Sequence, residues 1–167
     1  MATILITCSG GTVMLPDMPL LDRLDGGHLW VNPPREVWER MELTPLELTH
    51  WSFLIAATAQ AMMQELPQLR NGCINYWEAG NWALNDAAEP VGSKVPMQFR
   101  KVHMHLLGRS PVARHPDWGW GESPRFPDFV GAKQWAADFT LLNDDECTRI
   151  AASTIKCLRE KYAISVD

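Results

Sequence analysis

The first third of the chain alternates short apolar runs with turn-forming residues, a pattern typical of β-strands. Residues 4–7 and 12–15 are rich in β-prone side chains, and Ser9-Gly10-Gly11 between them predicts a hairpin turn. Residues 28–32 (His-Leu-Trp-Val-Asn) predict another strand. The two prolines that follow end this strand, because proline has no N–H to donate to a neighbouring strand.

Two later segments have the spacing of amphipathic helices. Thr44, Pro45 and Glu47 match a capping box with proline at the first helical position. Apolar side chains then recur at three- and four-residue intervals up to Pro67, at Trp51, Leu54, Ile55, Thr58, Met62 and Leu66. Residues 143–146 (Asn-Asp-Asp-Glu) are a second helix start, and this helix is predicted to run through Tyr162.

Two more strands are predicted at residues 72–77 and 98–107, with long loops after each of them. Residues 78–97 are too irregular for a regular element, and a loop of this length in a compact domain is usually functional or mobile. Residues 108–132 are rich in Pro, Gly, Trp and Arg and are expected to wrap the surface. No repeat or linker divides the chain, so we expect one domain over residues 1–167.

Composition narrows the choice of partners. The chain is 46% hydrophobic and 21% charged, with a net charge of −5, which fits a globular protein and argues against a nucleic-acid polymer as the main partner. The 4 cysteines lie far apart and are expected to be reduced thiols. No signal peptide or membrane-spanning run is apparent, so the sequence predicts a cytoplasmic protein without a membrane partner.

The chemistry-bearing residues are concentrated in residues 101–109, Lys-Val-His-Met-His-Leu-Leu-Gly-Arg. Because side chains alternate along a strand, Lys101, His103 and His105 are expected to share one face. Val102 and Met104 then face the core. Two imidazoles and a lysine on one face suit a phosphate group, although a solvated face with two histidines has the same pattern.

Metal binding is a third interpretation of the same residues. Two histidines two apart on a strand are a common ligand pair for zinc or iron. The further ligands have no recognisable second motif, and Lys101 on the same face would repel a cation. We therefore assign no metal ligand, and a metal-dependent enzyme using His103 and His105 remains an alternative.

These motifs resemble the histidine-triad (HIT) family of nucleotide hydrolases and transferases. The family signature, three histidines spaced two apart on a strand, matches residues 101–107 with lysine in the first position. Residues 27–35 (Gly-His-Leu-Trp-Val-Asn-Pro-Pro-Arg) are similar to a second family segment, and Asn75 fits the asparagine on the strand before the triad. The resemblance covers about residues 13–109, and residues 110–167 form an extension that it does not assign.

The resemblance implies an α+β fold: an antiparallel sheet with a long capped helix and a C-terminal helix. Family members commonly form homodimers through the long helix and a neighbouring strand. They need no cofactor, and they attack the α-phosphate of a nucleotide through a nucleotidyl-histidine intermediate. Phosphoanhydrides, phosphoramidates and dinucleoside polyphosphates are therefore the expected small-molecule substrates.

The resemblance also implies a role for each matching residue. His103 would be the nucleophile, and His105 would contact the phosphoryl oxygens. Lys101 would keep positive charge where the family has its first histidine, and Asn75, Gln98 and His28 would belong to the nucleotide site. The family's ribose-binding carboxylate matches either of two residues, Asp17 or Asp22.

The departures from the family pattern leave a second function open. A charged lysine cannot accept a hydrogen bond as a histidine can. We therefore expect Lys101 to affect the rate of turnover more than the affinity for the nucleotide. Gln98 stands one position later than the glutamine of the family. A nucleotide-binding module with weak or no turnover is therefore the alternative to a hydrolase.

Aromatic and basic residues around the two long loops have two interpretations each. Trp77, Trp82, Trp118 and Trp120 could stack on a base, but large aromatic side chains more commonly fill a core or an interface. Arginines at positions 109, 114 and 125 could supply charge to a polyphosphate. Pairing with neighbouring acids is the more common arrangement.

Overall fold

The computed structural model describes residues 2–166, and in this range the chain forms an α+β fold, as expected from the sequence. The strands are β1 (Thr3–Cys8), β2 (Gly11–Leu15), β3 (His28–Asn32), β4 (Cys73–Ala79) and β5 (His103–Arg109). The α-helices are α1 (Pro45–Glu65), α2 (Pro96–Phe99), α3 (Ala132–Trp135) and α4 (Asp144–Tyr162). The five strands form one antiparallel sheet in the order β1-β2-β3-β5-β4.

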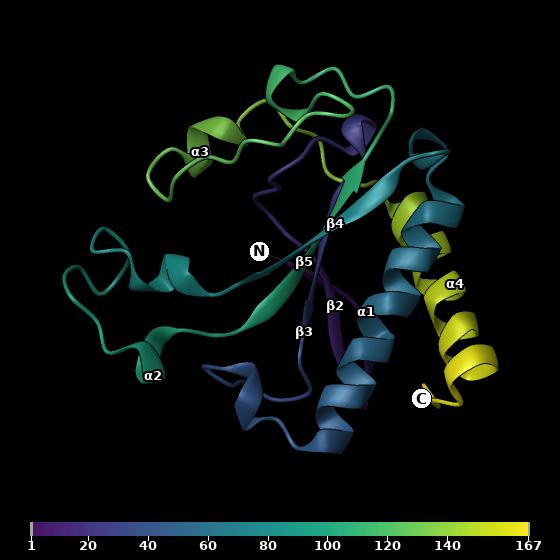
Figure 1. Cartoon of the computed structure of the whole chain (residues 1–167), viewed down its shortest axis with the longest axis horizontal. Coiled ribbons are helices and arrows are strands. Elements are labelled where there is room, and N and C mark those ends of the chain that lie inside the picture. The colour runs from purple at the N-terminus through teal and green to yellow at the C-terminus, as the bar shows by residue number, and fades with distance from the viewer. Residues whose placement is uncertain (1, 167) are drawn as a thin grey trace.

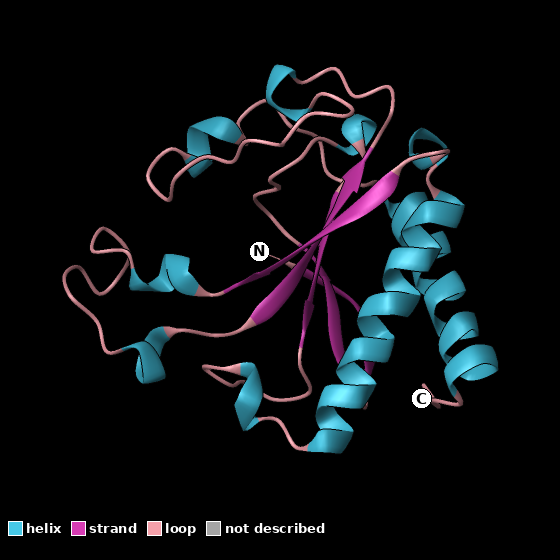
Figure 2. Cartoon of the chain, in the orientation of Figure 1, coloured by secondary structure: helices cyan, strands magenta, loops and turns pink. Residues whose placement is uncertain are grey.

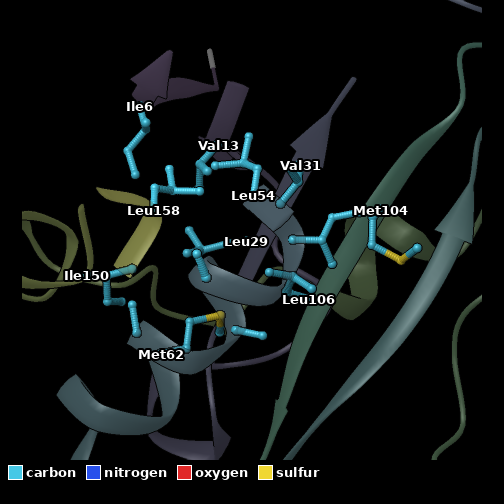
Figure 3. Close-up of a cluster of buried hydrophobic side chains, with 14 of the residues drawn as sticks. Ile6, Val13, Leu29, Val31, Leu54, Met62, Met104, Leu106, Ile150 and Leu158 are labelled. Atoms are coloured by element: carbon cyan, nitrogen blue, oxygen red, sulfur yellow. The ribbon is translucent and has the colours of Figure 1, made fainter. Parts of the chain in front are cut away.

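The two long helices, α1 and α4, pack side by side on one face of the sheet (Figure 1, Figure 2). The main core lies between these helices and the inner strands (Figure 3). Its side chains include Ile6, Val13, Leu29, Val31, Leu54, Met62, Met104, Leu106, Ile150 and Leu158. Burial of this continuous apolar surface is the main force that fixes the two helices against the sheet.

Sequence signals at the helix starts are confirmed in atomic detail. Thr44 Oγ1 accepts from the N–H of Glu47 at 3.3 Å, and the Glu47 carboxylate accepts from the N–H of Thr44 at 2.7 Å. Asn143 and Glu146 form the same capping box at the start of α4. Each box satisfies backbone donors that a helix start leaves without an intrahelical partner.

The opposite face of the sheet carries no long helix and is covered by loops instead (Figure 2). A second, smaller apolar cluster lies there, formed by Leu20, Leu21, Leu107 and Trp118. Leu107 and Leu106 are neighbours on β5 but belong to different clusters, because successive side chains of a strand point to opposite faces. This face, which carries no long helix, holds the candidate functional site.

The predicted strand at residues 98–107 is wrong at its start. Residues 96–99 form the short helix α2, and β5 begins at His103. Pro96 at the start of α2 has no N–H to donate to a strand. The Arg100 guanidinium, between α2 and β5, bonds to Asn81 at 2.9 Å and to Glu39 at 2.9 Å. Lys101 therefore lies just before the strand rather than within it.

Two further findings concern the whole chain. None of the helices in the described part of the chain is long and apolar enough to cross a membrane. The cysteines at positions 8, 73, 147 and 157 are free thiols.

Candidate functional site

Strands β3 and β5, which are neighbours in the sheet, bring the histidines together on the face without a long helix. In the sheet register, His105 of β5 stands opposite Trp30 of β3 on one side and opposite Trp77 of β4 on the other. His103 stands opposite Ala79. The alternation predicted for this segment is confirmed within β5, because Met104 and Leu106 point into the main core.

A close approach of two glycines places His28 beside this strand. A Cβ atom at Gly108 would lie 2.1 Å from the carbonyl oxygen of Gly26, so neither backbone leaves room for a side chain. Gly26 also has a positive φ of 140°, which glycine adopts without strain. The N–H of Gly108 donates to the carbonyl of Gly27 at 3.0 Å, and the next residue in the chain is His28.

Hydrogen bonds join three imidazoles into one line. Leu20 N–H donates to His28 Nδ1 at 3.1 Å, and His28 Nε2 lies 2.8 Å from His105 Nδ1. His105 Nε2 lies 3.0 Å from His103 Nε2. His103 Nδ1 lies 2.9 Å from the backbone carbonyl oxygen of Lys101. Every ring nitrogen of the three histidines therefore has a partner.

The backbone groups at the two ends of this line fix where the protons lie. A neutral imidazole has one N–H donor and one acceptor nitrogen. Since Leu20 donates to His28 Nδ1, His28 donates through Nε2 and His105 donates through its own Nε2. Since a carbonyl oxygen accepts, His103 carries its hydrogen on Nδ1. His103 Nε2 is thus unprotonated, and its lone pair accepts the hydrogen bond from His105 Nε2–H.

Burial keeps these rings neutral. Burial, and to a smaller extent the nearby His103, lower the pKa of His28 to about 3. Burial also lowers the pKa of His105 well below its ordinary value, with smaller effects of His28 and His103. The pKa of His103 is lowered by burial as well, against the hydrogen bond to Lys101, which favours the charged form. A neutral imidazole can act as a nucleophile near pH 7.

A cavity of about 290 Å³ opens over these rings. Its walls are largely apolar and include the indole rings of Trp30, Trp77 and Trp82. Trp77 stacks on His105 with ring centroids 5.2 Å apart, and Trp30 lies 5.6 Å from His103. Volume and lining suit a small ligand with an apolar, planar part.

The backbone and the side chain of Lys101 have different partners at the cavity. Its backbone carbonyl holds His103, while its ammonium group forms an ion pair with Glu36. The two backbone segments run side by side, since Val102 N–H donates to the carbonyl of Val37 at 2.9 Å. Lys101 does not share a strand face with His103 and His105, since β5 begins at His103, but all three line the same cavity, and the lysine charge already has a partner.

The structure separates the remaining residues predicted for the nucleotide site. Asp17 lines the cavity, whereas Asp22 caps a short helical turn and accepts from the N–H of Thr140 at 2.7 Å. Asn75 stands on the same face of β4 as Trp77 but outside the cavity lining. Gln98 is exposed on α2 and does not line the cavity. Of these four residues, the structure brings only Asp17 to the histidines.

Some of the tryptophans line the cavity, whereas two of the arginines have structural roles. Trp77 and Trp82 line the cavity, Trp118 is fully buried, and Trp120 is exposed. Arg109 is buried and donates to the carbonyls of Gly119 and Glu122 at 2.8 and 3.0 Å. Arg125 pairs with Asp117 at 3.5 Å. The arginines at positions 109 and 125 are thus engaged within the protein.

Sequence reasoning missed two features of this site. Trp30 lies on the same face of β3 as His28, two residues later, and the same alternation rule could have placed it in the site. Glu36 follows β3 in an irregular segment, and no pattern in the sequence connects it to Lys101 across the intervening residues.

Among residues 2–166, no group of three His, Cys, Asp or Glu side chains has the arrangement that a metal ion needs. The three histidines face one another through hydrogen bonds rather than converging on a common point. Comparison with known proteins adds no assignment, because no family model and no curated protein matches the chain.

Proposed function

We propose that this protein is a hydrolase of the histidine-triad type, which cleaves nucleotides at the α-phosphate through a nucleotidyl-histidine intermediate. One observation carries the proposal: the hydrogen-bonded line from Leu20 through His28 and His105 leaves His103 Nε2 unprotonated at the cavity, with its lone pair bonded to the N–H of His105 until a phosphate takes that N–H. The same line fits the motif resemblance, since it joins His28, His103 and His105, three of the residues that match the family.

The proposed reaction has two steps. His103 Nε2 attacks the α-phosphorus with its lone pair, a P–N bond forms, and the leaving group departs with the electrons of its bond to phosphorus. Water then attacks the same phosphorus atom. The P–N electrons return to His103 Nε2, the hydroxyl stays on the phosphate, and the proton of the water is released.

The neighbouring groups would assist both steps. His105 Nε2–H can turn from His103 to a phosphoryl oxygen and stabilise the charge that develops there. The carbonyl of Lys101 holds the Nδ1–H of His103, which fixes the ring and supports the positive charge of the phosphorylated imidazole. The aromatic walls suit a nucleobase, and Asp17 could accept hydrogen bonds from ribose hydroxyls.

A nucleotide-binding module with little turnover is the second candidate, and two observations favour it. Lys101 cannot take the place of a hydrogen-bonding imidazole, and its charge is paired with Glu36. Gln98, the expected contact to a phosphate or leaving group, is exposed outside the cavity. These features allow binding but remove groups that would speed the transfer.

The assembly and location that we propose follow the same resemblance. We propose a homodimer through α1 and β4, since β4 is an edge of the sheet and Tyr76 on it is 55% exposed. Light scattering after size-exclusion chromatography tests this, and a monomer at micromolar concentration contradicts it. The free cysteines fit the reducing cytoplasm.

The deciding experiment compares wild-type protein with His103→Ala in the presence of EDTA. The substrates are adenosine phosphoramidate, a diadenosine polyphosphate and ADP. We expect turnover by the wild type, none by His103→Ala, and a nucleotidyl adduct on His103 in rapidly quenched samples analysed by mass spectrometry. His50→Ala is the matched control, because His50 lies on α1, outside the cavity, and bonds to Ser9 in the turn between β1 and β2.

Each outcome assigns a function. Nucleotide binding without an adduct or turnover would support the binding module. Activity that EDTA abolishes would support the metal-dependent alternative. Equal activity of wild type and His103→Ala would overturn the proposed role of His103.

A further inference from the structure

The cavity over the histidines has little positive charge. Of the described residues that line it, Lys101 is the one with a permanent positive charge, while Asp17 and Glu78 are acidic. The three imidazoles are kept neutral by burial. A ligand with several negative charges would meet at least as many acids as cations on these walls.

The positive charge of Lys101 is itself paired with Glu36. The Lys101 ammonium pairs with the Glu36 carboxylate, and the side chains are 52% and 77% exposed. The backbone bond between Val102 and Val37 keeps the two partners next to each other. An exposed ion pair of this kind is weak, so a phosphate can compete for Lys101, but it must displace Glu36 to do so.

The other cations near the cavity are engaged or lie elsewhere. Arg100 bonds to Glu39 and Asn81, and Arg40 pairs with Glu78 at 2.5 Å. Lys133 lines a separate, shallower hollow, which shares Asp17 and Met18 with the cavity but none of the histidines. A chain of phosphates running from His103 would therefore not find a cluster of lysines or arginines.

We infer that the site selects nucleotides whose single phosphate is the one attacked, such as nucleoside phosphoramidates, over polyphosphates, and that Glu36 determines this preference through Lys101. The inference rests on the proposed function. One phosphate can be met by neutral donors, namely His105 Nε2–H and the indole N–H of Trp30, which is buried without an acceptor among the described residues. Each further phosphate adds charge that needs a cation when it leaves water.

The test measures both binding and turnover. AMP, ADP and ATP are titrated in EDTA, with quenching of tryptophan fluorescence as the signal, because Trp30, Trp77 and Trp82 line the cavity. Turnover of adenosine phosphoramidate is compared with that of diadenosine tetraphosphate. The test variant is Glu36→Gln. Glu160→Gln is the charge-matched control, since Glu160 is exposed on α4, on the other side of the sheet.

We expect wild-type protein to bind AMP at least as tightly as ATP and to prefer the phosphoramidate as substrate. Glu36→Gln frees Lys101 and should shift the ratio of ATP to AMP affinity roughly 2- to 5-fold toward ATP, as expected for loss of an exposed ion pair. Glu160→Gln should leave the ratio unchanged. Lys133→Gln should do the same, because Lys133 does not line the cavity.

Three results would overturn the inference. The first is a wild-type protein that binds ATP at least ten times as tightly as AMP. The second is an equal shift of the ratio of ATP to AMP affinity in Glu36→Gln and Glu160→Gln, and the third is a wild-type protein that binds no nucleotide. The expected binding order without turnover or an adduct would refute the proposed hydrolase while leaving the charge preference of the site established. The two failures are therefore distinguishable.

Discussion

The Nε2 atoms of His103 and His105 lie 3.0 Å apart, and the hydrogen between them belongs to His105. This assignment follows from the backbone groups at the two ends of the histidine line, Leu20 N–H and the carbonyl of Lys101. In the free protein the hydrogen of His105 therefore covers the lone pair of His103. A bound phosphate would give that hydrogen a better acceptor and release the lone pair for attack.

His28 acts through His105 and is expected to be a positioning residue. In His28→Asn the shorter side chain cannot bridge Leu20 and His105, so the proton of His105 loses its fixed position. We expect kcat to fall by about 10- to 100-fold with little change in KM, since misplacement of a reacting group by about 1 Å has an effect of this size. Steady-state kinetics on adenosine phosphoramidate measures both constants.

A purely structural role of His28 would look different. His50→Gln changes a histidine on α1 that bonds to Ser9, away from the cavity, and should leave kcat and the pH profile unchanged. If His28→Asn lowers activity only in proportion to the loss of folded protein, measured by circular dichroism, the proposed relay is wrong.

The pH dependence of kcat/KM tests the charge state of the nucleophile. Burial lowers the pKa of His103 below its ordinary value of about 6.5, so the ring is neutral at pH 7 and becomes protonated only in more acidic solution. We expect kcat/KM to be constant from pH 7 upward through pH 8 and to fall with an acid limb centred below 6.5. An acid limb above pH 7 would mean that His103 is charged in the resting protein.

Much of the fold could be predicted from local sequence patterns. The capping box at Thr44 and the apolar stripe through Trp51 and Met62 predict α1 because both depend on residues within a few positions. The Gly-rich turn before β2 and the prolines after β3 are also local signals, and they predict where these strands begin and end. In β5, alternation alone assigns His103 and His105 to the face opposite Met104.

The rest depends on contacts between distant segments. The role of His28 arises from the backbone approach of Gly26 and Gly108, and neither glycine reveals its partner in the sequence. The start of β5 is displaced because Arg100 bonds to residues far along the chain, Asn81 and Glu39. For the same reason the sequence could not show that Gln98 lies outside the cavity, nor that Asp17 rather than Asp22 lines it.

The glycine contact gives a prediction for stability. In Gly108→Ala the new Cβ would meet the Gly26 backbone, which cannot move aside without opening the sheet beside His28. We expect the free energy of unfolding in urea to fall by about 1–3 kcal/mol, the usual cost of forcing a methyl group into a packed region. Gly119→Ala is the control, because the nearest atoms there belong to the flexible side chain of Glu122. Equal unfolding free energies for the two variants would contradict the close approach.

The dependence of stability on pH tests the neutral state of His28 independently of any activity. Burial lowers the pKa of His28 to about 3, whereas an unfolded histidine titrates near 6.5. Below pH 6.5 the unfolded chain therefore binds a proton that the folded protein does not, and acid favours unfolding. This stabilisation is present above pH 6.5 and is lost progressively as the pH falls toward 3.

From pH 7 to pH 5, this one site should lower the free energy of unfolding by about 2 kcal/mol. His28→Asn should lose less stability over the same interval, and the difference between the two proteins isolates the contribution of His28 and of its effect on His105. Urea unfolding at constant ionic strength provides the values. If both proteins lose the same stability between pH 7 and pH 5, His28 takes up its proton in the folded state, and the proton arrangement derived for the histidine line does not hold.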